Sequence, residues 1–257
     1  MLTFAANLSW MFKEHAFLDR FTAAADAGFH WVEYLFPYEH DPNAIAARLS
    51  RHNLKLALFN APPGDMSQGE RGLACLPERA AQFRAGIAQA MDYAIITGAP
   101  RLHVMAGVGS GESSLSAYKD ALRFACEKAN HHGIDILIEP LNGYDAPGYL
   151  LNDFNLASRL IAELALPNLK LQFDIYHRQI IHGDVIHGLQ ELLPITGHMQ
   201  ISSVPGRNEP GSGELDDRHV LKAVEQFGYS GIIGCEYTPA AGTLEGLGWM
   251  KGLTHPT

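Results

Sequence analysis

The stretch of sequence that decides the fold is Ile134-Asp135-Ile136-Leu137-Ile138-Glu139-Pro140-Leu141-Asn142. An apolar run of strand length ends in a carboxylate, and a proline and a polar loop follow at once. A run of this kind is typical of a strand that is buried on both faces of a parallel sheet. A glutamate at its carboxyl end lies where a charge is costly unless something uses it. Glu139 is therefore a candidate functional residue.

Three later segments repeat this pattern, each with an oxygen ligand near its end: Leu169 to Asp174, Gly197 to Ile201 with Gln200, and Ile232 to Glu236. Earlier strand-like segments span residues 2–8, 31–36, 54–60 and 101–105. Helical patterns are expected at 14–27, 42–52, 78–98, 114–132, 153–165, 184–193, 217–227 and 243–251. Asn152 or Asp153 is the expected cap of the helix at 153–165. The alternation of strands and helices predicts an α/β fold with a parallel sheet.

Eight such units have one closed solution, the (β/α)8 or TIM barrel, and 257 residues match its usual size of about 250. We therefore predict a single (β/α)8 barrel domain over residues 1–257. A doubly wound open sheet is the alternative, and it would normally bind its ligand at one crevice near a topological switch point. Ligand-type residues here follow four successive strands, which a closed barrel brings together around one axis. This placement favours the barrel.

Two irregular segments interrupt the alternation. Residues 61–77 form a long loop rich in glycine, proline and polar residues, which is typical of a functional lid, while a linker between domains is the alternative. Residues 107–111 form a glycine-rich turn. A plain flexible turn is favoured over a phosphate cradle there, because the segment has neither a Walker lysine nor a complete G-x-G-x-x-G.

The bulk composition narrows the classes of partner. The net charge is −9, from 19 basic and 28 acidic residues, which argues against a nucleic-acid backbone as a standing partner. Three cysteines lie far apart without a C-x-x-C motif, as expected of reduced thiols in the cytoplasm. We recognise no signal peptide and no apolar run near the roughly 20 residues of a membrane span, so we expect a cytoplasmic protein. The sequence does not indicate an oligomeric state.

The strand-end residues predict a metal site. The carboxyl ends of all barrel strands open onto one face, so Glu139, Asp174, Gln200 and Glu236 would converge there. Three carboxylates without a counter-charge would repel one another in a partly dry cavity, so a divalent cation is a natural partner. This all-oxygen set suits a hard ion such as Mg²⁺ or Mn²⁺. For each residue alone, a helix cap or a salt-bridge partner is the plain alternative.

Three histidines and one arginine stand out by position. His177 lies just past the sixth strand and could hydrogen-bond a substrate hydroxyl or carbonyl. His198, two residues before Gln200, and His103, inside the fourth strand, are expected to support the site from behind or to be satisfied core histidines. Arg207 lies on the loop after the seventh strand, where it could pair with a substrate carboxylate or order the loop through a salt bridge.

Seven motifs follow in order along the chain: FAANLS (4–9), VEYLFPY (32–38), GERGLACLP (69–77), IEPLN (138–142), FDIYH (173–177), GHMQI (197–201) and GCEY (234–237). Together they resemble the hydroxypyruvate isomerase family of the xylose isomerase-like barrels. The resemblance implies a divalent metal site at the four strand-end residues, with Glu139 and Glu236 also serving as an acid/base pair. It further implies that His177 and Arg207 contact the substrate, a small sugar acid.

The resemblance implies a metal-dependent isomerase that interconverts hydroxypyruvate and 2-hydroxy-3-oxopropanoate (tartronate semialdehyde) through a cis-enediolate. In such a reaction the metal polarises the carbonyl and the neighbouring hydroxyl, one glutamate removes a proton from carbon, and the other protonates the former carbonyl carbon. A sister group in the same family acts on 2-oxo-tetronate, a four-carbon sugar acid, and residues 101–107 resemble that group. Residues 69–72, 139–142 and 209–214 resemble the hydroxypyruvate isomerases.

Three rival functions share the barrel or the chemistry. Metal-dependent abasic-site nucleases rely on histidines at strand ends and a basic groove, whereas this chain has Gln200 at the seventh strand and an acidic composition. A binding protein that has lost turnover would show a broken acid/base pair, yet both glutamates are present. A ketose 3-epimerase would use the same two glutamates on neighbouring carbons, and the size of the pocket would distinguish it.

Overall fold

The computed structural model describes residues 1–251 and 253 and contains a closed parallel barrel. Its strands are β1 (Thr3–Asn7), β2 (Trp31–Glu33), β3 (Lys55–Leu56), β4 (Phe59–Asn60), β5 (Arg101–His103), β6 (Asp135–Ile138), β7 (Leu169–Asp174), β8 (Thr196–Ile201) and β9 (Ile232–Cys235). Their order is β3-β2-β1-β9-β8-β7-β6-β5-β4, and the paired neighbours are parallel. The two ends of this order, β3 and β4, are pieces of one extended segment. The sheet therefore closes on itself, and the barrel prediction is confirmed.

The third predicted strand, 54–60, explains why nine strands are seen instead of eight. Its first half, β3, pairs with β2, and its second half, β4, pairs with β5. Hydrogen bonds from the N–H of Ala57 to Val32 and from the N–H of Ala61 to His103 continue the two pairings. The segment turns from one neighbour to the other at its middle. Its two halves together therefore occupy the place of one strand in an eight-stranded barrel.

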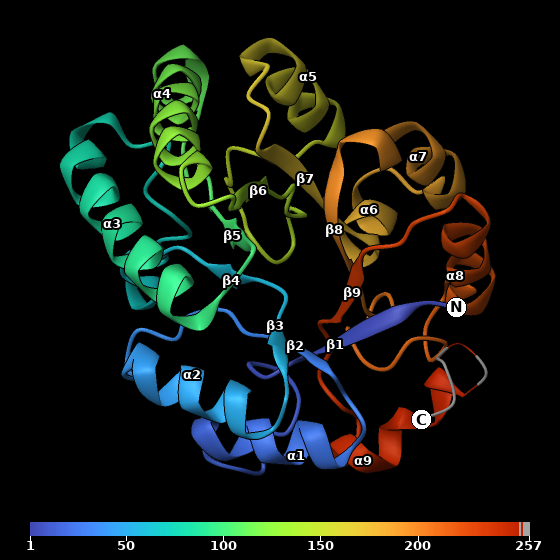
Figure 1. The fold of residues 1–257 in the computed structure, drawn as a ribbon. Coiled ribbons are helices and arrows are strands. Elements are labelled where there is room, and N and C mark those ends of the chain that lie inside the picture. Colours follow the sequence, from blue (N-terminus) through green and yellow to red (C-terminus); the bar gives the residue numbers. More distant parts are fainter. Residues whose placement is uncertain (252, 254–257) are drawn as a thin grey trace.

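Helices surround the strands (Figure 1). The described α-helices are α1 (Arg20–Asp26), α2 (Pro42–Arg51), α3 (Ala80–Thr97), α4 (Gly111–Asn130), α5 (Phe154–Leu164), α6 (Ile175–Ile181), α7 (Val185–Leu192), α8 (Asp217–Gln226) and α9 (Thr243–Gly246). The first begins six residues later than the predicted 14–27, and the predicted C-terminal helix is α9 followed by a 3-10 turn, Leu247–Met250. No described helix is long and apolar enough to cross a membrane.

Local sequence accounts for the helix starts that were predicted. Asp153 is the cap of α5, since its side chain accepts hydrogen bonds from the N–H groups of Asn155 and Leu156. Pro42 occupies the first turn of α2, where its missing N–H costs nothing, and Asp41 caps that helix. Helix α6 was not predicted. It starts directly after Asp174, whose side chain caps it by accepting from the N–H of Tyr176 at 2.8 Å.

The strands divide the interior into an apolar and a polar part. On β7 the ring of Phe173 packs against Phe154 of α5, with ring centroids 5.4 Å apart, so alternate residues of this strand face the helices. The residues between them, Gln172 and Asp174, face the barrel axis. Both are buried, as are the corresponding inward residues His198 and Gln200 of β8. A polar cluster therefore lies inside the barrel while the apolar core lies between strands and helices.

The two irregular segments are both held in place. Residues 61–77 connect β4 with α3, and the strands before and after them belong to the same sheet. Gly72 in this segment lies against the main chain of Met105 at a φ of +106°, where a side chain would clash. The glycine-rich turn pairs with residues 148–150, because the N–H of Gly109 donates to Gly148 and the N–H of Leu150 donates to Gly107. That pairing uses the N–H of Gly109 within the chain, instead of leaving it for a phosphate.

Candidate active site

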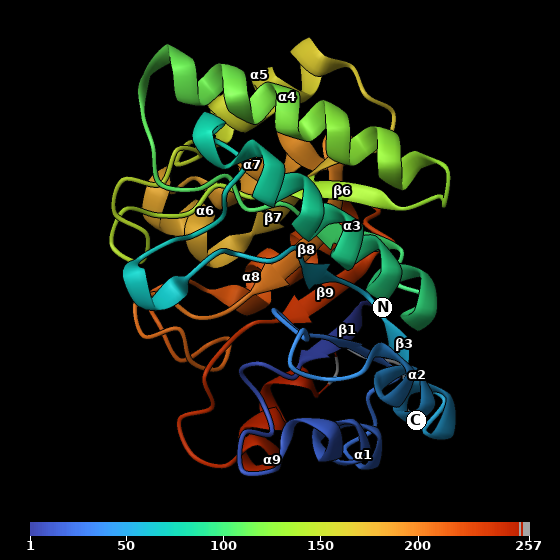
Figure 2. The same cartoon turned by 90° about the vertical axis from the view of Figure 1, so that its left-hand side faces the viewer.

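The four predicted strand-end residues lie at one end of the barrel, where the loops that follow the strands gather on one side of Figure 2. Asp174 on β7 is the register partner of Gln200 on β8, so their side chains are neighbours on the same face. Glu139 follows β6 and Glu236 follows β9. All four side chains are buried. The structure therefore brings together the residues that the sequence placed far apart.

Arg207 connects two of these carboxylates. Its Nη2 lies 3.5 Å from Asp174 Oδ2 and 3.5 Å from Glu236 Oε1. The guanidinium is stacked between the rings of Trp10 and Tyr176, with its central carbon 4.8 Å from each ring centroid. Arg207 thus supplies positive charge inside the carboxylate cluster, and the two rings fix the plane of its fork.

The backbone of Arg207 is itself held in an unusual conformation. Its φ is +52°, in the left-handed region that costs a non-glycine residue free energy. Two hydrogen bonds hold it, from its N–H to Ser203 at 2.9 Å and from the N–H of Thr238 to its carbonyl at 2.8 Å. The loop after β8 is therefore built to point this arginine into the site.

Sequence reasoning did not single out Trp10, Asp145 and Tyr176 as residues of the site. Trp10 follows β1, and its Nε1 donates to Glu236 Oε1 at 3.0 Å. Asp145 lies on the loop after β6, with Oδ2 3.5 Å from Arg207 Nη1. Trp10 and Glu236 are 226 residues apart, and only the pairing of β1 with β9 brings them together. A tryptophan directly after a strand carries no signal of its own for this contact.

Burial and mutual repulsion shift the pKa values of the carboxylates in this cluster. Burial raises the pKa of Glu139 well above its usual range, and the charges of Glu236 and Asp174 raise it further. Burial likewise raises the pKa of Asp174 to about 6 and that of Glu236 to about 8, in both cases against the lowering influence of Arg207. Burial lowers the pKa of Arg207, but the surrounding carboxylates outweigh it and the arginine stays charged.

His177 is held as a neutral hydrogen-bond donor. Burial, and next the charge of Arg207, lower its pKa well below 6.5. Its Nδ1 accepts from the main-chain N–H of Asn142 at 3.1 Å and lies 2.9 Å from the Nδ2 of the same residue. The Asn142 amide is oriented by its own Oδ1, which accepts from the N–H groups of Tyr144 and Asp145. The His177 proton therefore sits on Nε2, which faces Asp174 Oδ2 at 3.7 Å.

The two other histidines lie inside the barrel. His103 Nδ1 is 3.7 Å from Glu139 Oε2, and neither ring nitrogen has a hydrogen-bond partner among the described residues. Burial, with a smaller effect of His198, lowers the pKa of His103 to about 3, so this contact is not a charged pair at neutral pH. His198 contacts Glu33 at 2.7 Å. It is buried on β8, and its predicted role behind the site stays a prediction.

The cluster fits a divalent cation. Glu139 Oε1 and Asp174 Oδ2 are both buried and have no hydrogen-bond partner in the described part of the chain. A ligand atom of each, with one of His177, lies within 4.8 Å of the others, so this buried group could hold a metal ion. Because the proton of His177 sits on Nε2, its lone pair is turned away from the group, and the oxygen atoms of the strand-end residues are the better ligands. Oxygen donors suit a hard cation.

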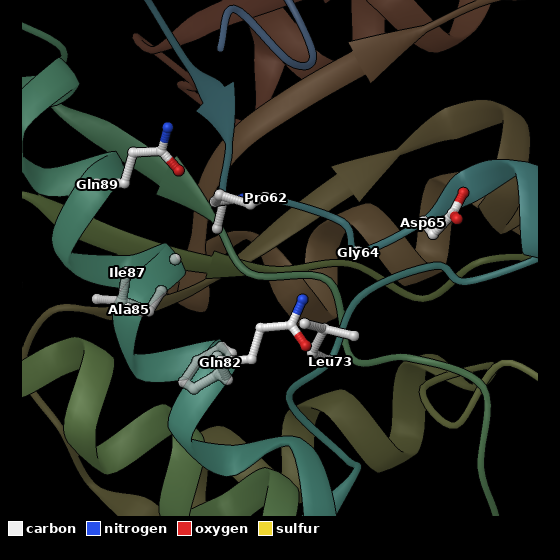
Figure 3. Close-up of a pocket in the computed structure, with 11 residues that line it drawn as sticks. Pro62, Gly64, Asp65, Leu73, Gln82, Ala85, Ile87 and Gln89 are labelled. Atoms are coloured by element: carbon white, nitrogen blue, oxygen red, sulfur yellow. The ribbon is translucent and has the colours of Figure 1, made fainter.

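A hollow lies away from this cluster. It has a volume of about 610 Å³ and lies between the segment after β4 and helix α3 (Figure 3). Pro62, Gly64 and Leu73 line it from the segment, and Gln82 and Ile87 line it from the helix. It shares no residue with the carboxylate cluster, so the chemistry of the site does not belong to this hollow.

Comparison with known proteins identifies the family to which the chain belongs. The xylose isomerase-like TIM barrel family model matches residues 21–253. A 2-oxo-tetronate isomerase from Cupriavidus necator is 49% identical over 255 residues, which cover 98% of each chain. The hydroxypyruvate isomerase of Escherichia coli is 39% identical, over 97% of this chain and 98% of that one. A crystal structure named AP endonuclease, family 2, from Brucella melitensis has a TM-score of 0.95 at 42% identity, over 97% and 98% of the two chains. The chain therefore belongs to the xylose isomerase-like TIM barrel family and, like its curated relatives, is an isomerase.

Proposed function

We propose that this protein moves a carbonyl group between carbons 2 and 3 of a short sugar acid, converting a 2-oxo-3-hydroxy acid into a 2-hydroxy-3-oxo acid. The observation that carries the proposal is the buried cluster of Glu139, Asp174 and Glu236 around Arg207, in a chain whose relatives are named sugar-acid isomerases. The cluster offers acids, bases and a fixed positive charge close together in the buried interior.

Glu139, Asp174, Gln200 and Glu236 are the residues we propose as ligands of Mg²⁺ or Mn²⁺. When bound, such an ion supplies Lewis-acid polarisation of the substrate carbonyl and the neighbouring hydroxyl oxygen. Glu139 Oε1 and Asp174 Oδ2, which lack a hydrogen-bond partner among the described residues, support this assignment. Gln200 also keeps a free acceptor site, because its Oε1 accepts one hydrogen bond, from Gln172 Nε2 at 2.6 Å.

Glu139 and Glu236 are the residues we propose for proton transfer between the two carbons. One glutamate removes the proton from the hydroxyl-bearing carbon 3. The electron pair of the broken C–H bond then forms the double bond between carbons 2 and 3 of an enediolate. The other delivers a proton to carbon 2, while the hydroxyl proton passes from the oxygen on carbon 3 to the oxygen on carbon 2. The pKa of Glu236, raised to about 8, supports this role, because groups that titrate near neutral pH are the most effective general acids and bases. Burial raises the pKa of Glu139 in the same direction.

His177 and Arg207 are the residues we propose for substrate contact. The Nε2–H of His177 faces the cluster and can donate to a substrate hydroxyl or carbonyl oxygen. Arg207 Nε is buried and has no partner among the described residues, so its N–H is available to a substrate carboxylate oxygen. The stacked rings of Trp10 and Tyr176 fix that N–H in place.

Two substrates share this reaction and differ by one hydroxymethyl group on carbon 3: hydroxypyruvate and 2-oxo-tetronate. More of the sequence motifs favour hydroxypyruvate. The relative named 2-oxo-tetronate isomerase is 49% identical, against 39% for the Escherichia coli hydroxypyruvate isomerase. We therefore propose 2-oxo-tetronate as the preferred substrate and hydroxypyruvate as the second.

The test is a comparison of kcat/KM for both acids with Mg²⁺-loaded protein, following isomer formation by NMR. We expect turnover of both, faster with 2-oxo-tetronate. Fructose serves as the control for a ketose 3-epimerase, and a DNA duplex with an abasic site serves as the control for the activity named for the Brucella structure. Turnover of a control substrate without turnover of either acid would contradict the proposal.

A further inference from the structure

Glu33 is a buried carboxylate inside the barrel with three side-chain partners. It ends β2 and has no measurable exposure. Its Oε1 accepts from Asn7 Nδ2 at 3.0 Å and from Gln200 Nε2 at 2.9 Å, and its Oε2 contacts His198 Nε2 at 2.7 Å. A carboxylate accepts hydrogen bonds, so the proton of His198 lies on Nε2. Glu33 is therefore the acceptor in each of these three hydrogen bonds.

The contact with Gln200 decides which way its amide faces. The nitrogen of the amide lies against Glu33, so the carbonyl oxygen lies on the opposite side, where it accepts from Gln172. Turning the amide over would set its oxygen against a carboxylate and its nitrogen against the Gln172 nitrogen. Gln172 is an amide and could turn together with Gln200, since its own Oε1 has no partner among the described residues, whereas the carboxylate of Glu33 can only accept. Glu33 therefore decides the orientation.

We propose that Glu33 is a positioning residue that keeps the carbonyl oxygen of Gln200 on the side of the amide away from Glu33, where it can serve as a ligand for the divalent cation. This role rests on the metal site of the proposed function. Partners of this kind typically alter metal affinity about 10- to 100-fold when they are removed. Glu33 needs no contact with substrate to act in this way.

Gly234 provides the space that Glu33 needs. It lies on β9, where it is the register partner of Gln200. A Cβ on Gly234 would overlap the carboxyl group of Glu33. Gly234→Ala would therefore push Glu33 away from Gln200 while leaving every charge of the cluster in place. This separates the orienting effect of Glu33 from the effect of its negative charge.

The variant Glu33→Gln has a defined structural consequence. The N–H of His198 attracts the carbonyl oxygen of the new amide, so its NH2 group would face residue 200. The amide of Gln200 would then turn its oxygen toward residue 33 and its nitrogen toward the cation. The exchange Glu33→Gln with Gln200→Glu removes this conflict, because a carboxylate at 200 can accept from residue 33 and still offer an oxygen to the cation.

The experiment measures the Mn²⁺ dissociation constant by electron paramagnetic resonance for the wild type and for Glu33→Gln, Glu33→Asp, Gly234→Ala and the exchange variant. Circular dichroism and thermal melting identify the folded variants. We expect at least tenfold weaker binding for each single variant, and an affinity within about threefold of wild type for the exchange variant. Glu33→Asp keeps the charge but shortens the side chain, so it replaces Gly234→Ala if that variant does not fold.

Three outcomes would overturn the role. Unchanged affinity in Glu33→Gln would exclude Glu33 from the metal site while leaving the proposed function intact. Weakening in Glu33→Gln alone, with wild-type affinity in the charge-conserving variants, would show that charge acts instead of orientation. Failure of the wild type to bind Mn²⁺ would overturn the metal site of the proposed function and this role with it.

Discussion

The confined carboxylates predict that the metal-free protein loses stability when the pH rises from 7 to 8.5. The pKa of Glu236 is raised from 4.5 to about 8, chiefly by burial. Between these values the folded protein keeps a proton that the unfolded chain has released. The folded state thus binds more protons than the unfolded state, so the free energy of unfolding falls with rising pH and levels off above about pH 8.

Buried histidines have the opposite effect on the free energy of unfolding at lower pH. The measurement is therefore made above pH 7, where their effect is complete. Burial lowers the pKa of His103 to about 3 and that of His177 well below 6.5, so the unfolded chain binds more protons at these sites below about pH 6.5. Their contribution makes stability rise with pH and is complete near pH 7. From pH 7 to 8.5, Glu236 alone lowers the free energy of unfolding by about 1 kcal/mol, and Glu139 acts in the same direction.

The assay is urea unfolding of the protein in a chelator at pH 7.0 and pH 8.5, with Glu236→Gln as the matched control. We expect a lower free energy of unfolding at pH 8.5 in the wild type and a smaller difference in the variant, which has lost one titrating group. Equal or greater stability of the wild type at pH 8.5 would refute the reasoning, because it would mean that the carboxylates are already ionised at pH 7.

Three further predictions concern single side chains. Glu236→Gln should lower kcat at least about 100-fold with an unchanged far-ultraviolet spectrum, because a positioned acid or base contributes about 10²–10⁴-fold; retention of more than a tenth of kcat would count against its role. Arg207→Lys should raise KM for the acid about tenfold or more, because lysine cannot make the fork between Trp10 and Tyr176, and an unchanged KM would argue against carboxylate binding there. Asp153→Ala should lower the free energy of unfolding by about 1 kcal/mol in urea titrations through loss of the α5 cap, with kcat unchanged; no loss of stability would contradict the cap.

The barrel could be predicted from the sequence because its strands are short apolar runs with regular spacing. What sequence could not give was the bending of one strand toward two neighbours, since both halves of 54–60 are equally apolar and only the closed sheet separates them. Helix α6 was missed because Asp174 serves twice. Its Oδ1 caps that helix while its Oδ2 faces the cluster, and a single carboxylate after a strand does not reveal both uses.

The residues at strand ends were brought together as predicted, but their surroundings were not foreseen. Glu33 repeats the pattern of Glu139, a glutamate that ends a buried strand, so a signal for it was present in Trp31-Val32-Glu33. Its three partners come from β1 and β8, and no local pattern joins them. Trp10 is a similar case, because its contact with Glu236 depends on the closure of the barrel. Contacts across the barrel axis can be identified only once the fold is known.

The central claim is that one glutamate of a cation-binding cluster removes a proton from carbon 3 of a short sugar acid and a second glutamate delivers a proton to carbon 2. The most direct measurement is ¹H NMR of 2-oxo-tetronate and of hydroxypyruvate with Mg²⁺-loaded protein in D2O. The account predicts that the 3-oxo isomer appears and carries solvent deuterium on carbon 2, because the delivering glutamate exchanges with solvent. Absence of turnover for both acids, or an isomer free of deuterium as a hydride shift would produce, would contradict it.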